Sequence, residues 1–326
     1  EPATTYHFRI TATNDGGESF PTEVLSAVWQ PEAKQTVLIV NGFHRLAAPA
    51  VVDNDSLQGF DLLADPGITY GTTAGWSGYQ QCFDKRQMGI EGPGGLGFCG
   101  TELQGQYVAG NTFDYVRTHA DAIATARRYN IVSCSSEALE ADMMNLKHVD
   151  AIDLILGLEK HDADVLPTLP NYKAFSPQMQ QVLRRFTSQH GRLLVSGANI
   201  TSDMLAPSDR EFLSALLKVA PCLNTDDFGN TFIARNRLAA VNGMGMSFDF
   251  HNTLNEKHYA AVSTDILLPL QPAYCALQYG DGSSAAVAYT GRDYKAFATG
   301  FPLECIRSQQ ARESVLRGIM QFLFAK

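Results

Sequence analysis

The fold of this chain is decided by residues 152–198, which read Ile152-Asp-Leu-Ile-Leu-Gly-Leu158, then a polar stretch and a helix-like run from Ser176 to His190, then Gly191-Arg-Leu-Leu-Val-Ser-Gly197. The short apolar runs at 154–156 and 193–195 are typical of strands buried on both faces of a parallel sheet. Between them, Ser176 can cap a helix that has Pro177 at its first position. Apolar residues then recur at helical spacing: Met179, Val182, Leu183 and Phe186. The segment therefore predicts a strand, a crossover helix and a second parallel strand.

Ligands bind at the carboxyl ends of the strands in open α/β sheets. A further apolar run, Thr36-Val-Leu-Ile-Val-Asn-Gly42, predicts the first strand of the same sheet, and Asn130-Ile-Val-Ser-Cys134 predicts another. We therefore expect ligand-binding residues just at or after the strand ends, namely Asn41, His44, Ser135 and Asn199. Ser135 also precedes a predicted helix, where a serine is more commonly a cap than a reactive group.

Composition predicts a well-packed globular protein, because 45% of the 326 residues are hydrophobic and 18% are charged. The net charge of -9 argues against nucleic acid as the main partner. No apolar run approaches the roughly 18 residues of a transmembrane helix. The sequence shows no initiator Met and no signal peptide, and it begins inside a structural pattern. We expect a processed or truncated piece of a longer chain, with upstream domains as partners.

The six cysteines predict neither a metal site nor a redox motif, since none lie in CxxC spacing and no His/Cys cluster accompanies them. Disulfides would be possible in an exported protein, and Cys82 and Cys99 flank one loop, but buried free thiols are the expected state. Asp249, His251 and His258 lack a third ligand at a familiar spacing. We expect no metal and no cofactor.

Residues 4–29 predict two strands and a turn. Tyr6, Phe8 and Ile10 alternate with polar residues, and Asn14-Asp-Gly-Gly17 predicts the turn. The stretch Thr5-Tyr-His-Phe-Arg-Ile-Thr-Ala-Thr-Asn14, followed by Gly16-Gly-Glu-Ser19 and Pro21, resembles the last two strands of a fibronectin type III domain. We therefore assign residues 1–30 to the end of such a domain. Because two strands cannot form a β-sandwich, either the earlier strands are missing or the hairpin packs on the next domain.

Residues 60–112 predict a long glycine-rich insertion with little periodicity. Its run Glu91-Gly-Pro-Gly-Gly-Leu-Gly97 lacks the Gly-Lys-Ser/Thr ending of a phosphate-binding loop. Trp76 and Tyr79 could stack on the sugar rings of a glycan or peptidoglycan fragment. The alternative is that these aromatic residues form a local core under the loop.

The main domain, residues 36–326, resembles the class I glutamine amidotransferase-like superfamily. Its resemblance is carried by Val37-Leu-Ile-Val-Asn-Gly42, Ile152-Asp-Leu-Ile-Leu-Gly157, the run from Gln180 to Gly197, and Gly300-Phe-Pro-Leu-Glu304 before a last predicted helix at 308–324. The resemblance implies an α/β fold: an open, mostly parallel, flavodoxin-like sheet with helices on both faces. Antiparallel strands are expected at 228–289.

A narrower resemblance joins Ala109-Gly-Asn-Thr-Phe-Asp-Tyr115 and Gly300-Phe-Pro-Leu-Glu-Cys305 to domains of exported Bacteroidetes proteins. Such proteins carry names such as putative xanthan lyase or N-acetylmuramoyl-L-alanine amidase, and they contain fibronectin type III repeats. The resemblance implies a secreted, periplasmic or cell-surface protein that acts on cell-wall or other polysaccharide.

Glutaminase activity is not expected. The amidotransferases carry a nucleophilic Cys in a Gly-x-Cys-x-Gly turn after a central strand, whereas here the strands end in Gly157-Leu-Glu159 and Ser196-Gly-Ala-Asn199. The late His-x-Glu pair is missing from 301–304 as well. The sequence therefore favours an accessory module of an exported protein.

The alternative function is a hydrolase of amidase or esterase type. Ser196 ends a predicted strand and is followed by Gly197, as a nucleophile could be, and it would need a histidine base and an acid. The candidate bases are His119, His44 and His251, and the candidate acids are Asp114, Glu159 and Asp203. In the competing interpretation, Ser196 only satisfies backbone groups in a turn.

Overall fold

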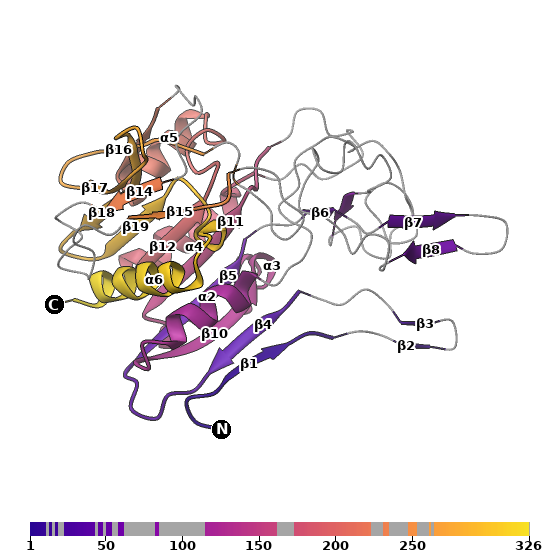
Figure 1. Ribbon diagram of the computed structural model, residues 1–326. Helices are drawn as coiled ribbons and strands as arrows, with labels where there is room; N and C mark the ends of the chain where they lie inside the picture. The colour runs from indigo at the N-terminus through magenta and orange to yellow at the C-terminus, as the bar shows by residue number, and fades with distance from the viewer. Residues whose placement is uncertain are drawn as a thin grey trace.

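The computed structural model describes seven stretches with their side chains and seven short strands by their backbone alone (Figure 1). The stretches are 1–10, 23–42, 115–161, 173–222, 247–252, 261 and 264–325. The short strands are 13–14, 17–18, 45–47, 50–53, 58–61, 82–84 and 231–234.

The centre of the molecule is a parallel sheet of five strands: β10 (Tyr129–Ser135), β5 (Gln35–Asn41), β11 (Ala151–Gly157), β12 (Arg192–Gly197) and β19 (Lys295–Thr299). Each pairs with its neighbour in parallel, in the order β10-β5-β11-β12-β19. Numbered along the chain, this order is 2-1-3-4-5, which is that of flavodoxin. The predicted strand–helix–strand unit is confirmed as β11, α4 (Pro177–Ser188) and β12.

Antiparallel strands extend this sheet at both edges. With them, the sheet contains eleven strands in the described part of the chain. Beyond β19 lie β18 (Ser284–Thr290), β17 (Tyr274–Gln278), β14 (Thr231–Ala234) and β15 (Ser247–Asp249), which agrees with the antiparallel strands expected at 228–289. The predicted α/β fold is therefore confirmed. The parallel part of its sheet is formed by the five central strands.

The N-terminal hairpin forms the other edge. Strands β1 (Thr5–Phe8) and β4 (Leu25–Val28) pair antiparallel, and β4 joins β10 where Val28 lies opposite Ile131. Of the two alternatives for this hairpin, the structure shows that it packs on the following domain and extends its sheet. The assignment to a fibronectin type III domain stays a prediction.

Helices cover both faces of the sheet (Figure 1). On one face lie α2 (Tyr115–Ala124) and α6 (Gln309–Phe324); on the other lie α3 (Ser136–Glu140), α4 and α5 (Pro207–Phe212). The predicted apolar side of the last helix is buried: Val315, Leu316, Ile319, Phe322 and Leu323. Two buried clusters result, one on each face of the sheet.

Shorter elements complete the described chain. They are the 3-10 turns η2 (Leu146–His148) and η5 (Leu303–Cys305), the π-helical turn η3 (Leu213–Leu217) that continues α5, and the paired strands β13 (Val219–Pro221) and β16 (Leu267–Pro269). The remaining pairs are β2 (Thr13–Asn14) with β3 (Gly17–Glu18), β6 (Arg45–Ala47) with β9 (Cys82–Asp84), and β7 (Ala50–Asp53) with β8 (Gln58–Asp61).

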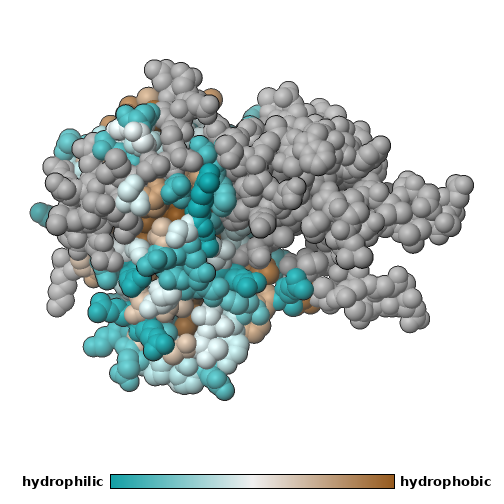
Figure 2. All heavy atoms as spheres, viewed as in Figure 1, coloured by the Kyte–Doolittle hydropathy of each residue, from teal (hydrophilic) through white to brown (hydrophobic). Residues whose placement is uncertain are grey.

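On the face drawn in Figure 2, hydrophilic residues alternate with small groups of hydrophobic ones over the described surface. Within the described residues, no helix is long and apolar enough to cross a membrane.

Candidate functional site

Polar residues form a row across the carboxyl ends of the parallel strands. Ser135 of β10 lies opposite Asn41 of β5, and Ile155 of β11 lies opposite both Asn41 and Ser196 of β12. Ser196 in turn lies opposite Thr299 of β19. The strand order reverses between β5 and β11, and open α/β proteins bind ligands at such a switch point. The predicted edge therefore exists as a structural feature.

Three of the predicted ligand-binding residues at this edge lie in the described part of the chain, and each has a local partner. The buried Asn41 side chain donates to the Glu23 carboxylate at 2.7 Å. Ser135 accepts the Ala138 N–H at 3.2 Å and so caps α3. Asn199 donates to the Leu158 carbonyl at 3.2 Å, which links the turns after β11 and β12. Ser135 therefore has the helix-capping role that its sequence position indicated. Ligand binding by Asn41, Ser135 and Asn199 stays a prediction.

Close backbone contacts shape the switch point. The N–H of Gly42 donates to the Ile155 carbonyl at 2.7 Å, and a Cβ at position 42 would lie 2.6 Å from that oxygen. Gly157, which ends β11, has a φ of 54°, in the left-handed region that favours glycine. Glu159 follows this turn as a buried residue. Gly42 and Gly157 thus allow the tight backbone approach and the turn that precede the buried carboxyl group of Glu159.

A buried cluster of three ionisable side chains lies on the α2 side of the sheet. His119 of α2 contacts Asp153 of β11 through Nδ1 at 2.8 Å, and Glu304 of η5 through Nε2 at 3.4 Å. All three side chains are 0% exposed. Because the three residues come from a helix, a central strand and the turn before the last helix, their contacts join elements that are distant in sequence.

This cluster keeps His119 protonated. Burial by itself would lower the pKa of His119, but the charge and hydrogen bond of Asp153, and then those of Glu304, outweigh burial and raise the pKa to about 10. A histidine with this pKa holds its proton at neutral pH and cannot accept another.

The structure does not bring Ser196 and His119 into hydrogen-bond contact. Ser196 is fully buried, and its Oγ has no hydrogen-bond partner among the described residues. His119 uses its ring nitrogens for Asp153 and Glu304 instead. The acids beside His119 are thus Asp153 and Glu304, whereas the predicted Asp114 lies outside the described residues.

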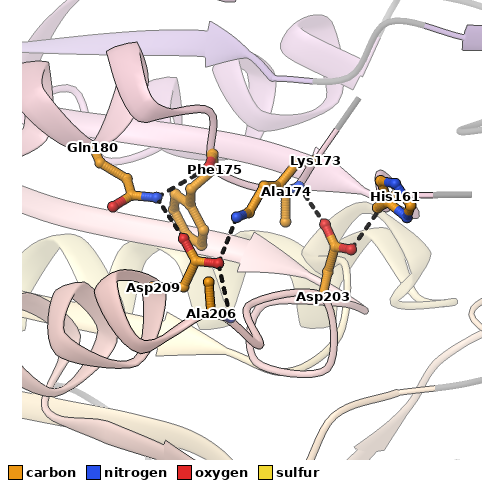
Figure 3. Close-up of polar contacts among 8 residues, drawn as sticks. All are labelled: His161, Lys173, Ala174, Phe175, Gln180, Asp203, Ala206 and Asp209. Atoms are coloured by element: carbon orange, nitrogen blue, oxygen red, sulfur yellow. Dashed lines mark hydrogen bonds and ion pairs between the residues drawn. The ribbon is translucent and has the colours of Figure 1, made fainter. Parts of the chain in front are cut away.

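The turn after β12 is held by carboxylates on both sides. One oxygen of the buried Asp265 accepts the backbone N–H and the hydroxyl of Thr201, the latter at 2.9 Å, and the N–H of Ser202 at 3.0 Å. Burial raises the pKa of Asp265, and these hydrogen bonds oppose the rise. On the other side, Asp203 accepts the N–H of His161 at 2.9 Å and that of Ala174 at 2.7 Å (Figure 3).

Figure 3 also shows how the start of α5 is fastened to its surroundings. Asp209 accepts hydrogen bonds from Lys173, from Gln180 at 3.1 Å and from the N–H of Ala206 at 3.2 Å. Gln180 lies on α4, so this carboxylate of α5 connects α5 with α4. The turn that carries Asn199 is therefore set in a polar framework made of backbone donors and carboxylates.

Sequence reasoning missed three of these residues: Asp153, Asp265 and Glu304. Asp153 had a visible signal, because it is a charged residue inside the apolar run Ile152-Asp-Leu-Ile-Leu156, and such residues are rarely buried unless paired. Glu304 was quoted only as part of a family resemblance, and Asp265 lies beside an unremarkable short strand.

Several predicted residues lie outside the described part of the chain: His44, Trp76, Tyr79 and Asp114. Among the described residues no group of three or more His, Cys, Asp or Glu could hold a metal ion. Of the cysteines whose side chains are described, Cys134 and Cys305 are buried and Cys222 and Cys275 are partly exposed. The pairing considered for Cys82 and Cys99 is not described.

Comparison with known proteins does not assign the chain to a family. No protein-family model matches it, and no curated protein matches it. Among solved structures, it is similar to the cytoplasmic protein STM3548 from Salmonella typhimurium, at 11% identity and a TM-score of 0.49 over 88% of this chain and 98% of the other.

Two further similar structures are a ThuA-like protein from Parabacteroides merdae and a GMP synthase component from Thermoplasma acidophilum. The first has 7% identity and a TM-score of 0.41 over 90% of this chain and 91% of the other. The second has 10% identity and a TM-score of 0.39 over 64% of this chain and 87% of the other. These values concern the α/β fold alone, and none of the three proteins is named a xanthan lyase, an amidase or a fibronectin domain. The chain is a flavodoxin-like α/β protein with an antiparallel extension at each edge of its sheet.

Proposed function

We propose that this chain is an accessory, non-catalytic α/β module of an exported multidomain protein that acts on cell-wall or other polysaccharide. In this proposal, the module binds a glycan or peptidoglycan fragment at the carboxyl edge of its sheet, near Asn41, Glu159 and Asn199. Upstream domains of the same protein would supply the catalytic activity.

The observation that carries the non-catalytic part is the state of His119. An acyl-transfer site needs a neutral histidine that takes the proton of its nucleophile. His119 is enclosed by Asp153 and Glu304 and holds its proton at neutral pH, and it makes no hydrogen bond to Ser196. Together with the missing amidotransferase Cys, this arrangement supports a binding role over hydrolysis.

Support for the binding edge comes from its place in the sheet. Asn41 ends β5 and Glu159 follows β11, so the two flank the point where the strand order reverses. Asn199 is fastened to the Leu158 carbonyl of the adjacent turn. Amide and carboxyl groups held in this way can recognise sugar hydroxyls, which both donate and accept hydrogen bonds.

The test is a binding screen of the purified chain against peptidoglycan fragments and polysaccharides, with product release measured on every ligand that binds. We expect binding without turnover, and we expect Asn199→Ala and Glu159→Gln to weaken binding at least 10-fold. The exposed Glu211→Gln, on α5, is the matched control for a removed carboxylate. Binding that neither Asn199→Ala nor Glu159→Gln weakens would contradict the proposed edge.

The second candidate is a hydrolase of amidase or esterase type. It is favoured by one feature, the buried Glu159 carboxyl group directly after the central strand β11. Turnover that is lost in Ser196→Ala or Glu159→Gln, and retained in the exposed control Ser188→Ala, would establish this function and refute the accessory module.

A further inference from the structure

The N-terminal hairpin presents its apolar side to solvent. In the register of β1 and β4, Tyr6 lies opposite Ala27 and Phe8 opposite Leu25. Directly opposite residues of an antiparallel pair point to the same face. These four side chains therefore share one face of the hairpin.

The other face of the hairpin is the one that packs on the domain. His7 hydrogen-bonds Ser26 at 2.8 Å and Asp121 of α2 at 3.0 Å, and Val28 belongs to the buried cluster beneath α2. The alternation of the strand thus directs its polar residues toward the helix and its aromatic residues away from it. This orientation is the reverse of the usual arrangement for a half-buried strand.

The uncovered face carries most of the exposed large hydrophobic side chains of the described chain. Tyr6 and Phe8 are 39% and 54% exposed. Trp29, just after β4, and Ile10, shortly after β1, continue the alternation of their strands and are also exposed, Trp29 to 60%. The rings of Tyr6 and Phe8 stack with centroids 6.3 Å apart. We call the set Tyr6, Phe8, Ile10, Leu25, Ala27 and Trp29 the hairpin face. All six side chains are uncharged.

The area of the hairpin face sets the kind of partner it fits. A large aromatic side chain buries roughly 150–250 Å², so the exposed fractions correspond to about 400 Å² of apolar surface with Ile10 included. A patch of this size is at the level where monomeric proteins show functional surfaces. Two such faces packed together, with Leu25 and Ala27 at their centre, approach the roughly 1,000 Å² that a specific protein interface needs.

We propose that the hairpin face binds the hairpin face of a second copy of this chain. An apolar sheet face can pack against its own copy across a two-fold axis, and packed sheets lie about 10 Å apart. At the lower edge of Figure 1, β1 and β4 form the outermost pair of the sheet, so a second copy reaches them without displacing α2. Since the buried area falls somewhat short of that threshold, the dimer is weak and reversible.

The net charge of each copy gives the dimer a specific dependence on salt. Two chains of charge -9 repel each other, and salt screens that repulsion. Dimerisation through an apolar face therefore strengthens when the salt concentration rises from about 0.05 M to about 0.5 M, whereas an interface made by ion pairs weakens.

The experiment is sedimentation velocity on the purified chain over a concentration series at both salt concentrations. We expect a monomer–dimer equilibrium that strengthens with salt, and a dissociation constant raised at least 10-fold in Phe8→Glu and in Trp29→Glu. Leu205→Glu and Leu268→Glu are the matched controls, since they place the same charge on exposed apolar residues elsewhere, and they leave the equilibrium unchanged. The circular dichroism spectrum of each variant checks its folding.

Two results overturn the proposal. One is a wild-type chain that stays monomeric at every concentration; if Trp29→Glu then abolishes retention on immobilised polysaccharide, the face stacks on sugars instead. The other is a dimer that Phe8→Glu and Trp29→Glu leave intact.

Discussion

The cluster of His119, Asp153 and Glu304 makes a quantitative prediction about stability. The pKa of His119 is raised from 6.5 to about 10 in the folded chain, so the folded state binds this proton more tightly than the unfolded state. The stabilisation is complete below about pH 6.5 and is lost as the pH rises through about 10. This pKa difference corresponds to on the order of 5 kcal/mol.

The substitution His119→Gln removes the positive charge and leaves Asp153 and Glu304 buried without it. Breaking a buried ion pair by removing one partner costs roughly 3–5 kcal/mol, in agreement with the value from the pKa. We expect the free energy of unfolding at pH 7 to fall by about this amount. The exposed His148→Gln is the control and should change it by less than about 0.5 kcal/mol.

Urea denaturation from pH 7 to pH 9 measures the effect. Across this range, the proton on His119 makes the wild-type free energy of unfolding fall by about 1.4 kcal/mol per pH unit more than that of His119→Gln. If the two proteins show the same dependence on pH, the histidine is not a buried cation and the reasoning is refuted. If His119→Gln does not fold, an NMR titration of the His119 ring in the wild-type chain still decides the pKa.

Three further predictions concern packing and hydrogen bonds, each measured by urea denaturation. Asp265→Asn weakens three hydrogen bonds to the turn after β12 and should lower the free energy of unfolding by about 1–3 kcal/mol. The control Asp293→Asn, at an exposed position, should leave that free energy almost unchanged. Gly300→Ala places a Cβ against the backbone oxygen of Asp265 and should destabilise the fold by about 1–3 kcal/mol; an unchanged urea midpoint would show that the backbone yields freely. Ser176→Ala removes the cap of α4 and should cost about 1 kcal/mol, whereas a cost no larger than that of Ser188→Ala would contradict the capping role.

The proposed dimer and the proposed ligand edge can be tested separately, because they lie at different places in the sheet. The hairpin face belongs to β1 and β4 at one edge, whereas the ligand edge lies at the carboxyl ends of β5, β11 and β12. A variant such as Phe8→Glu should therefore change self-association without changing ligand binding, and Glu159→Gln should do the reverse.

The regular elements of the central domain were predictable because their signals are local. Continuous apolar runs predicted β5, β11 and β12, and the serine cap with helical periodicity predicted α4 between them. The helix that begins at Pro207 was less predictable, because it changes to a π-helical turn at Leu213 and ends before Lys218, which has a left-handed φ of 57°. Apolar spacing alone does not reveal such a change in hydrogen bonding.

The chemistry of the candidate site was less predictable, because it depends on contacts between distant residues. His119 meets Asp153, 34 residues away, and Glu304, 185 residues away. Which acid reaches the histidine depends on the register of β11 against its neighbours and on the rotation of α2 above the sheet. Sequence reasoning left Asp114, Glu159 and Asp203 open as the acid, and it had no means of aligning α2 with the middle of a strand.

The sequence by itself determined that this chain forms a parallel α/β sheet, since burial on both faces requires the continuous apolar runs that are visible in it. It also determined that β1 has one apolar and one polar side. Only the tertiary structure decided which side is covered: α2 supplies Asp121 to His7, so the polar side faces inward and Tyr6 and Phe8 face solvent. The alternation defines two faces of a strand, but the neighbour that packs against one of them comes from elsewhere in the chain.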